Sequence, residues 1–163
     1  MKILLATDGS EHSRLALEQA AALAAPSKGE VVALVVSNLI NLGWYGAIPH
    51  ATETPFEVPT SEEAEQILAG ACKTLSARGV ACRPLRRVGV PADTILAVAE
   101  EERVDLIVMG SHGRTGLGRF LLGSVSSQVS THAPCSVLIA KPKLDVVSPD
   151  FPEPIHLSNV QKA

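Results

Sequence analysis

The chain has few of the features that mark a membrane, secreted or nucleic-acid-binding protein. Its 163 residues carry a formal net charge of −3, so it lacks the excess of positive charge that binds nucleic acid or an anionic membrane. No apolar run approaches the roughly 20 residues that a membrane-spanning helix needs. The opening segment 1–10 also lacks a secretory signal pattern. We therefore expect a cytoplasmic protein, with neither nucleic acid nor a membrane among its partners.

Cysteine is scarce, and its three positions are Cys72, Cys82 and Cys135. An odd number of cysteines in apolar surroundings indicates reduced side chains, which agrees with a cytoplasmic protein. Cys72 falls on the apolar face of a predicted helix, where we expect it to be part of the core. His132 and Cys135 have a spacing found in metal sites, but no second pair accompanies them, and we interpret them as a helix end.

Hydrophobic residues make up 46% of the chain and charged residues 19%, which is typical of a globular domain. Five segments read as strands, and four of them are nearly continuous runs of Ile, Leu and Val, as in strands that are covered on both faces. The segment 79–88 differs, because it holds three arginines and Pro84, and this composition predicts an edge strand. The other four predicted strands are residues 2–7, 30–36, 105–110 and 136–140.

Helix signals lie between the predicted strands. Thr60 and Glu63 form a capping box, and Gly79 stands where a left-handed residue ends a helix. The remaining signals are Ser10 or Ser13 before a helix that Pro26 ends, Pro91 before a helix through Glu102, and Gly123-Ser124 before a helix that ends near Pro134. This alternation of strands and helices predicts a parallel sheet with helices on both faces.

Two segments do not fit the alternation. Residues 37–60 are longer than a compact connection needs, and they hold Trp44, Tyr45 and Phe56. Because burying aromatic rings is favourable, we expect this loop to close over a ligand site, or else its rings to pack on a dimer partner or on the protein's own surface. Residues 142–163 hold four prolines and are expected to form an extended tail.

A glycine-rich segment follows the fourth predicted strand. Residues 110–123 contain five glycines, and such a cluster indicates a sharp bend or a close approach to another group. We expect Gly113 to take a positive φ and to let a phosphate come close. The helix that begins at Ser124 offers unpaired backbone amides and a positive dipole, and Arg114 and Arg119 add positive charge. The segment therefore predicts an anion site.

The standard motifs for phosphate binding and for nucleophilic catalysis are absent. Residues 118–124 have the glycine spacing of a Walker A loop but lack its lysine. Residues 116–121 begin like a dinucleotide fingerprint, lack its last glycine and follow the fourth strand instead of the first. The G-x-S-x-G pattern of hydrolases does not occur.

The spacing that is present is G-x2-G-x9-G-S, with Gly110, Gly113, Gly123 and Ser124. Together with "ILLATDGSEHSRLAL" at 3–17 and the block from "VGVPADTIL" to "SVLIAK" at 88–141, it resembles the universal stress protein family over residues 1–141. In that family this pattern marks the members that bind ATP. The resemblance implies one domain over 1–141, with 37–60 as an inserted loop and 142–163 as a tail. It also implies an α/β fold, an open five-stranded parallel sheet of order 3-2-1-4-5 (adenine nucleotide alpha-hydrolase-like), and a homodimer through strand 136–140.

The resemblance also implies a nucleotide site. Asp8 would accept hydrogen bonds from the ribose and help to position a magnesium-bound triphosphate, although it is also suited to cap the first helix. The adenine would be lined by Ala6, Thr7 and Val36. The triphosphate would lie against Gly110, Gly113, Arg114, Gly123, Ser124, Val125 and Ser126, and Met109, Ser111 and His112 complete the binding segment.

These inferences lead to an ATP-binding regulatory protein of the stress response, which signals through its dimer or through an unknown protein partner. We assign no catalytic residue, because only Asp8 is an obvious base near the loop, and slow ATP hydrolysis is the most we expect. One alternative is an interaction protein without nucleotide, which acts through residues 37–60 and the tail. A weaker alternative is a hydrolytic or nucleotidyl-transferring enzyme.

Overall fold

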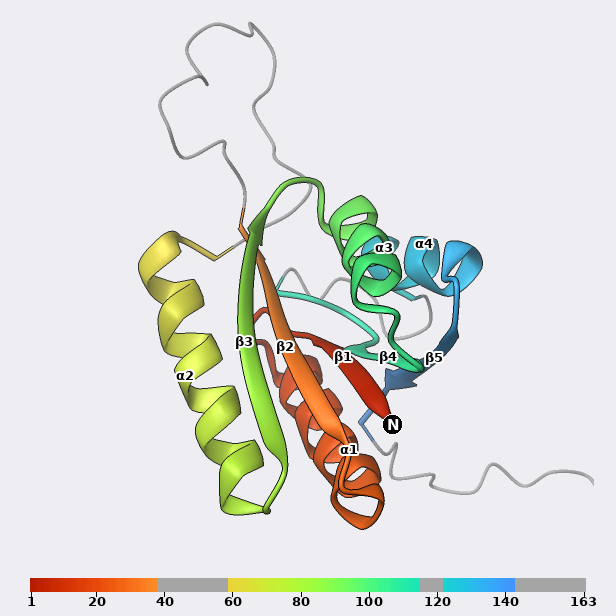
Figure 1. Cartoon of the computed structure of the whole chain (residues 1–163). Helices are drawn as coiled ribbons and strands as arrows, with labels where there is room; N and C mark the ends of the chain where they lie inside the picture. The colour runs from red at the N-terminus through yellow and green to blue at the C-terminus, as the bar shows by residue number, and fades with distance from the viewer. Residues whose placement is uncertain (38–58, 115–121, 143–163) are drawn as a thin grey trace, which may run out of the picture.

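The structure, a computed structural model, describes residues 1–37, 59–114 and 122–142. Five parallel strands form one sheet in the order β3-β2-β1-β4-β5 (Figure 1), which confirms the predicted fold. The strands are β1 (Lys2–Ala6), β2 (Glu30–Ser37), β3 (Ala81–Val88), β4 (Leu106–Gly110) and β5 (Ser136–Ala140). The helices are α1 (Glu11–Ser27), α2 (Ser61–Ala77), α3 (Pro91–Glu102) and α4 (Ser124–His132). No helix in these ranges is long and apolar enough to cross a membrane.

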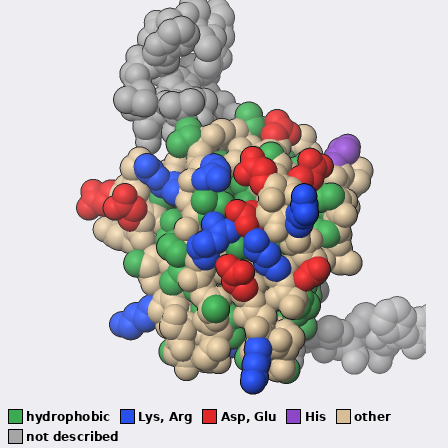
Figure 2. All heavy atoms as spheres, in the orientation of Figure 1, with side chains coloured by type: hydrophobic (Ala, Val, Ile, Leu, Met, Phe, Trp, Pro, Cys, Tyr) green, Lys and Arg blue, Asp and Glu red, His purple; other side chains and the backbone are tan. Residues whose placement is uncertain are grey.

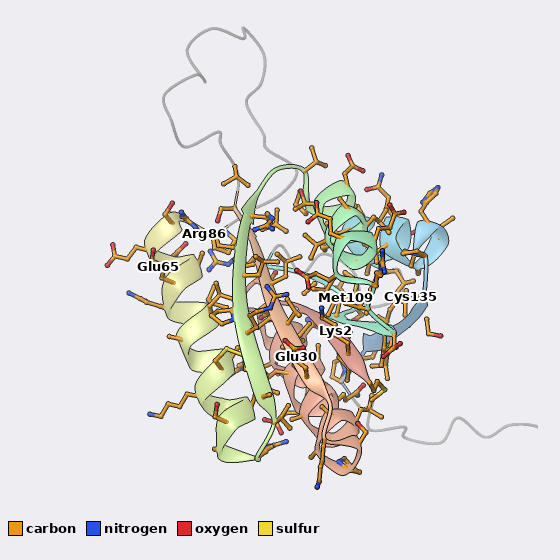
Figure 3. The ribbon with its side chains drawn as sticks, in the orientation of Figure 1. Lys2, Glu30, Glu65, Arg86, Met109 and Cys135 are labelled. Carbon is orange, nitrogen blue, oxygen red and sulfur yellow. A yellow bond between two sulfur atoms is a disulfide. The ribbon has the colours of Figure 1, made fainter. Side chains whose placement is uncertain are left out.

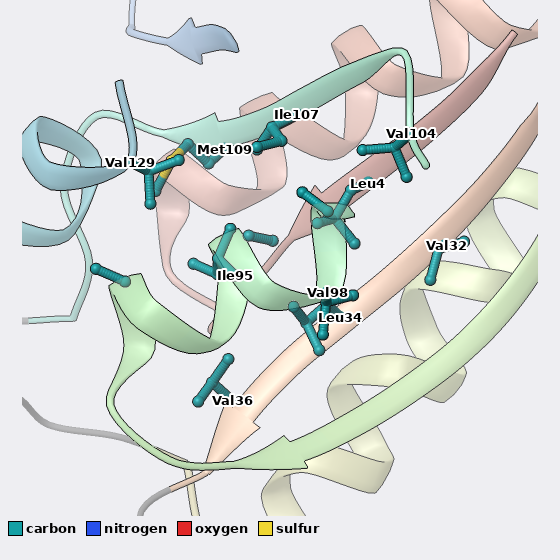
Figure 4. Packing of buried hydrophobic residues seen from close by; sticks show 13 residues of the cluster. Leu4, Val32, Leu34, Val36, Ile95, Val98, Val104, Ile107, Met109 and Val129 are labelled. Atoms are coloured by element: carbon teal, nitrogen blue, oxygen red, sulfur yellow. The ribbon is translucent and has the colours of Figure 1, made fainter. Parts of the chain in front are cut away.

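The helices cover both faces of the sheet, with α1 and α2 on one face and α3 and α4 on the other (Figure 1). The central strand β1 pairs with β2 and β4, so that Leu4 lies between Val32 and Ile107. These three side chains are completely buried, and Figure 4 shows them beside Ile95 and Val98 of α3. The apolar runs in the sequence are therefore the core of the sheet, as predicted for strands covered on both faces.

The predicted helix boundaries agree with the structure with one exception. Ser10 is the N-cap of α1, the capping box of Thr60 and Glu63 begins α2, and Gly79 has φ of 71°. The expectation that Pro26 ends the first helix is wrong, because α1 continues to Ser27. A proline in the last turn gives up only its own backbone hydrogen bond, so the turn can close around it.

The edge strand β3 is the most polar strand of the sheet, as its arginines and proline predicted. Arg86 and Arg87 are exposed on it, and Figure 3 labels Arg86 beside the start of α2. Lys, Arg, Asp and Glu side chains are intermixed on the face that Figure 2 shows. Among the described residues, Arg83 forms ion pairs with Glu30 and Glu102, and Arg87 forms one with Glu101. These arginines of β3 thus lie among carboxylates.

The expectation of three reduced cysteines is wrong for two of them. Cys72 of α2 and Cys82 of β3 form a disulfide, with their Cα atoms 5.3 Å apart. After α2 the chain turns and runs back along the helix as β3. Cys72 and Cys82, which are ten residues apart, therefore lie opposite each other on these two elements. Both side chains are half-buried between α2 and the sheet, so Cys72 is only partly a core residue. Cys135 is a free cysteine, and burial raises the pKa of its thiol.

Candidate functional site

The predicted site residues gather at the carboxyl ends of β1 and β4, which are neighbours in the sheet. Ala6 at the end of β1 pairs with Met109 near the end of β4. From β1 the chain continues toward β2 on one side, and from β4 it continues toward β5 on the other. Parallel sheets bind ligands where the strand order reverses in this way. Residues that are about one hundred positions apart thus meet at one end of the sheet.

Asp8 connects the end of β1 to the glycine segment. One oxygen of its carboxylate accepts a hydrogen bond from the backbone N–H of Ser10 (3.0 Å), and the other accepts one from the backbone N–H of Arg114 (3.1 Å). The Arg114 side chain donates in return, from Nε to the backbone oxygen of Asp8 (3.0 Å). Asp8 therefore holds the turn before α1 and also contacts the glycine segment.

The guanidinium of Arg114 also reaches the beginning of α2. Its Nη1 lies 3.3 Å from Oε2 of Glu63, and the same oxygen accepts a hydrogen bond from the backbone N–H of Thr60 at 2.8 Å. The hydrogen bond from Thr60 and the positive charge of Arg114 lower the pKa of Glu63. The sequence identified Glu63 only as part of a capping box. Its contact with Arg114 has no local signal, because 51 residues separate the two.

Gly110 and Gly113 of the segment are glycines for different structural reasons. A Cβ on Gly110 would lie 2.8 Å from the backbone carbon of His12, so only glycine lets α1 pack this closely on β4. A Cβ on Gly113 would instead lie 2.8 Å from a carboxylate oxygen of Asp8. The expectation of a positive φ at Gly113 is wrong, since the described glycines with positive φ are Gly9, Gly79 and Gly89. What the site requires at Gly113 is the absence of a side chain, and its backbone is not left-handed.

Helix α4 begins beside this turn. The backbone N–H of Gly123 donates to the backbone oxygen of Ser111 (2.8 Å), which fixes the start of the helix against the end of β4. No side chain among the described residues caps α4, so amides of its first turn are left for a ligand. Ser124 is exposed there, and Val125 packs partly on the core. The hydroxyl of Ser126 donates to Ser111 and is 2% exposed, so only the backbone of Ser126 remains for a ligand.

The residues predicted to line the adenine are mostly buried. Ala6 and Val36 belong to the core cluster on the face that carries α3 and α4. Met109, which was predicted for the binding segment, belongs to the same cluster, and Figure 3 labels it near α3. Thr7 is half-buried, and its hydroxyl donates to the hydroxyl of Ser13 (3.1 Å). Val36 lies near the end of β2, one strand away from Ala6, and the two side chains share the same cluster. Ala6 and Thr7 directly precede Asp8 in the chain.

His112 is the remaining predicted residue of the turn. Its ring lies 5.2 Å from the ring of His12, measured between centroids, and its Nδ1 lies 3.2 Å from the hydroxyl of Ser111. The other nitrogen of the ring, Nε2, is buried with no hydrogen-bond partner among the described residues. The ring therefore packs on the start of α1.

The described residues contain no group of three or more His, Cys, Asp or Glu side chains that could hold a metal ion. A magnesium ion at Asp8 would need its other ligands from phosphate and water, which is how Mg²⁺ is usually held in nucleotide sites. His132 is the last residue of α4, as expected for a helix end. Arg119, Trp44, Tyr45 and Phe56 lie outside the described residues, as do most of the predicted loop 37–60 and tail 142–163.

Comparison with known proteins agrees with this architecture. The family model described as "Universal stress protein family" matches residues 1–141. The chain is similar to universal stress protein MJ0531 of Methanocaldococcus jannaschii, at 36% identity over 86% of this chain and 81% of that protein. It is also similar to universal stress protein MJ0577 of the same organism, at 32% identity over 87% of this chain and 95% of that protein.

Solved structures show the same fold. The structure of MJ0577 aligns to this chain with a TM-score of 0.72 and 33% identity. The alignment covers 88% of this chain and 96% of the MJ0577 chain. The structure of a universal stress protein in complex with cAMP aligns with a TM-score of 0.65 and 25% identity. The alignment covers 86% of this chain and 97% of that protein chain. The family model, the relatives and the sheet order agree, and this chain belongs to the universal stress protein family.

Proposed function

We propose that this protein is an ATP-binding regulatory protein of the stress response. The observation that carries the proposal is the meeting of three elements at the ends of β1 and β4. These are the carboxylate of Asp8, a turn in which Gly113 has no room for a side chain, and the start of α4, which no described side chain caps. Free amides at a helix start bind phosphate, and a carboxylate one strand away is suited to ribose hydroxyls.

Each part of the site has one task in this proposal. The backbone of the turn, the guanidinium of Arg114 and the first amides of α4 bind the triphosphate. Asp8 accepts hydrogen bonds from the ribose and is the carboxylate nearest to a magnesium ion carried by the phosphates. Ala6, Thr7 and Val36 contact the adenine. The related structure in complex with cAMP supports an adenine nucleotide as the ligand class.

The output of binding is regulation, with at most slow hydrolysis of ATP. Fast phosphoryl transfer needs an oriented nucleophile in addition to charge stabilisation. In the turn, Asp8 already accepts hydrogen bonds from Ser10 and Arg114 through its two carboxylate oxygens. The state of the site would be transmitted within the cytoplasm, through a protein partner or through a homodimer of the 1–141 domain.

The homodimer is proposed to form through β5, the apolar strand at one edge of the sheet. An unpaired apolar edge favours pairing with another strand. Replacing Ile139, which is half-buried there, with lysine should shift the sedimentation coefficient toward that of the monomer. An exposed position on α4 such as Gln128→Lys is the matched control, and it should leave sedimentation unchanged. A dimer that survives Ile139→Lys would assign the interface to another surface.

The test of the proposed function is isothermal titration of protein from which copurified nucleotide has been removed. We expect Mg-ATP to bind more tightly than AMP, and AMP more tightly than adenosine, because the donors of the site face phosphates. Equal affinities for ATP and adenosine would contradict the phosphate site. No binding of any of the three would favour the alternative, an interaction protein that acts through residues 37–60 and the tail.

A further inference from the structure

Arg114 is already engaged by the protein itself. Its side chain contributes Nε to the backbone oxygen of Asp8 and Nη1 to the carboxylate of Glu63. In the first contact the guanidinium is held beside the end of β1, and in the second it is neutralised by a carboxylate from another element. The side chain of Arg114 is 25% exposed, so it is held in place and is still accessible from solvent.

Glu63 and a phosphate group would compete for the same guanidinium. A carboxylate and a phosphate both accept hydrogen bonds from a guanidinium, and both carry the negative charge that attracts it. The contact with Glu63 uses Nη1 of Arg114 at 3.3 Å. A phosphate that binds this guanidinium therefore either displaces Glu63 from it or lies close to the negative charge of Glu63.

Glu63 does not follow Arg114, because it is fixed by its own helix. Its Oε2 accepts the hydrogen bond of the Thr60 N–H, and its backbone N–H donates to the Thr60 hydroxyl at 3.2 Å. This capping box positions the carboxylate whether or not Arg114 contacts it. When the guanidinium moves to a phosphate, the negative charge of Glu63 stays near the site.

We propose that Glu63 sets the affinity and the charge selectivity of the nucleotide site by competing with phosphate for Arg114. The inference rests on the proposed function, because it concerns the phosphates of the same nucleotide. Glu63 does not contact the nucleotide itself. It determines specificity indirectly, through its contact with Arg114. It weakens the binding of phosphorylated ligands and has no effect on a nucleoside that lacks phosphate.

The decisive variant is Glu63→Gln, because glutamine keeps the hydrogen bonds of a capping box and loses the charge. The matched control is Glu62→Gln, which removes the same charge from an exposed position in the same turn of α2. Both variants should melt within a degree or two of each other, a shift that corresponds to well under 1 kcal/mol for a domain of this size. Dissociation constants for Mg-ATP and adenosine are then measured by titration calorimetry at low salt.

We expect Glu63→Gln to bind Mg-ATP about two- to fivefold more tightly than Glu62→Gln, which is the range of a partly exposed ion pair. Adenosine should bind both variants equally. In an Arg114→Gln background the difference between the two glutamate variants should disappear, because the shared donor is gone. The gain should also shrink as salt is added, since salt screens exposed charges.

The possible outcomes separate this inference from the proposed function. If the wild-type protein binds no ATP, the proposed function fails and the competition fails with it. If the wild type binds ATP but both glutamate variants bind it equally, only the competition is overturned. Weaker binding of ATP by Glu63→Gln would also overturn it, and would show that Glu63 holds Arg114 in the position that phosphate needs.

Discussion

The two ends of the sheet each place an arginine among carboxylates, with different results. At the amino ends of the strands, Arg83 of β3 contacts Glu30 and Glu102, and Nζ of Lys2 lies 2.7 Å from Glu102 (Figure 3 labels Lys2 and Glu30). The backbone N–H of Lys2 donates to Asp105 at 2.7 Å. These groups satisfy one another and join β1, β2, β3 and the end of α3.

At the carboxyl ends, Arg114 contacts Asp8 and Glu63, and an uncapped helix start lies nearby among the described residues. At this end, backbone amides at the start of α4 therefore form no hydrogen bond with a capping side chain of the described residues. The comparison shows that the charged residues at both ends of the sheet contact one another, and that only the carboxyl end has an uncapped helix start beside them among the described residues. The presence of free backbone amides makes the difference.

The largest expected effect tests whether the carboxyl end is also structural. Gly110→Val should lower the free energy of unfolding by about 3 kcal/mol or more, because its Cβ would meet the backbone of His12 at 2.8 Å. Urea denaturation measures the change. Gly70→Val in α2 is the control, since no atom lies within 4 Å of a Cβ there, and it should change stability by less than about 1 kcal/mol. Equal effects of the two variants would contradict the close packing of α1 on β4.

The second effect separates ligand binding from stability at the same end. Gly113→Val should weaken ATP binding at least tenfold, about 1.4 kcal/mol or more, because the added side chain occupies the space beside Asp8. Its effect on the free energy of unfolding should stay below about 1 kcal/mol, since the nearest atom belongs to the half-buried side chain of Asp8 and not to the backbone. Calorimetry and urea denaturation are compared on the same samples. A variant that unfolds as readily as Gly110→Val would show that this glycine, too, serves the fold.

The third effect tests the amino end. Glu102→Gln should lower the free energy of unfolding by about 1 kcal/mol, because two cations lose their shared partner. ATP affinity should not change. Glu100→Gln, an exposed position on the same helix, should alter neither quantity. A loss of ATP affinity in Glu102→Gln would mean that the two ends of the sheet are coupled.

The smallest expected effect is the pH dependence of the contribution that Glu102 makes to the free energy of unfolding. Hydrogen bonds from Lys2 and Arg83 lower the pKa of Glu102 in the folded protein, so its stabilising contribution is complete above the pKa of the unfolded chain. The contribution is lost as the pH falls through the folded pKa, which lies below the ordinary value of a glutamate. The stability difference between the wild type and Glu102→Gln should therefore narrow in acid. A difference that stays constant from pH 7 to pH 3 would contradict this role of the carboxylate.

Much of the fold was predictable because its signals are local. The apolar runs identified the strands, and the capping box at Thr60 and the glycine at 123 identified helix starts within one residue. The edge position of β3 followed from its arginines and Pro84. The family resemblance added the strand order and the list of site residues, and the structure confirms the strand order.

Apart from the end of α1 at Pro26, the errors and omissions concern contacts between distant residues. The disulfide between Cys72 and Cys82 depends on how α2 and β3 pack together, which an odd cysteine count does not reveal. The hydroxyl of Ser126 is not left for a ligand, because it donates a hydrogen bond to the backbone oxygen of Ser111. Gly113 needs space beside Asp8 and has no left-handed backbone, a distinction that requires knowing its neighbour.

The sequence by itself determined the order of the strands and helices, because hydrophobic periodicity and caps act within a few residues. It also determined that a turn rich in glycine precedes the start of a helix. The tertiary structure alone decided which groups the described residues of that turn, 111–114, meet. Arg114 contacts Asp8 across 106 positions of the chain and Glu63 across 51, and only the packing of α2 and β4 on one sheet brings those carboxylates to the same guanidinium.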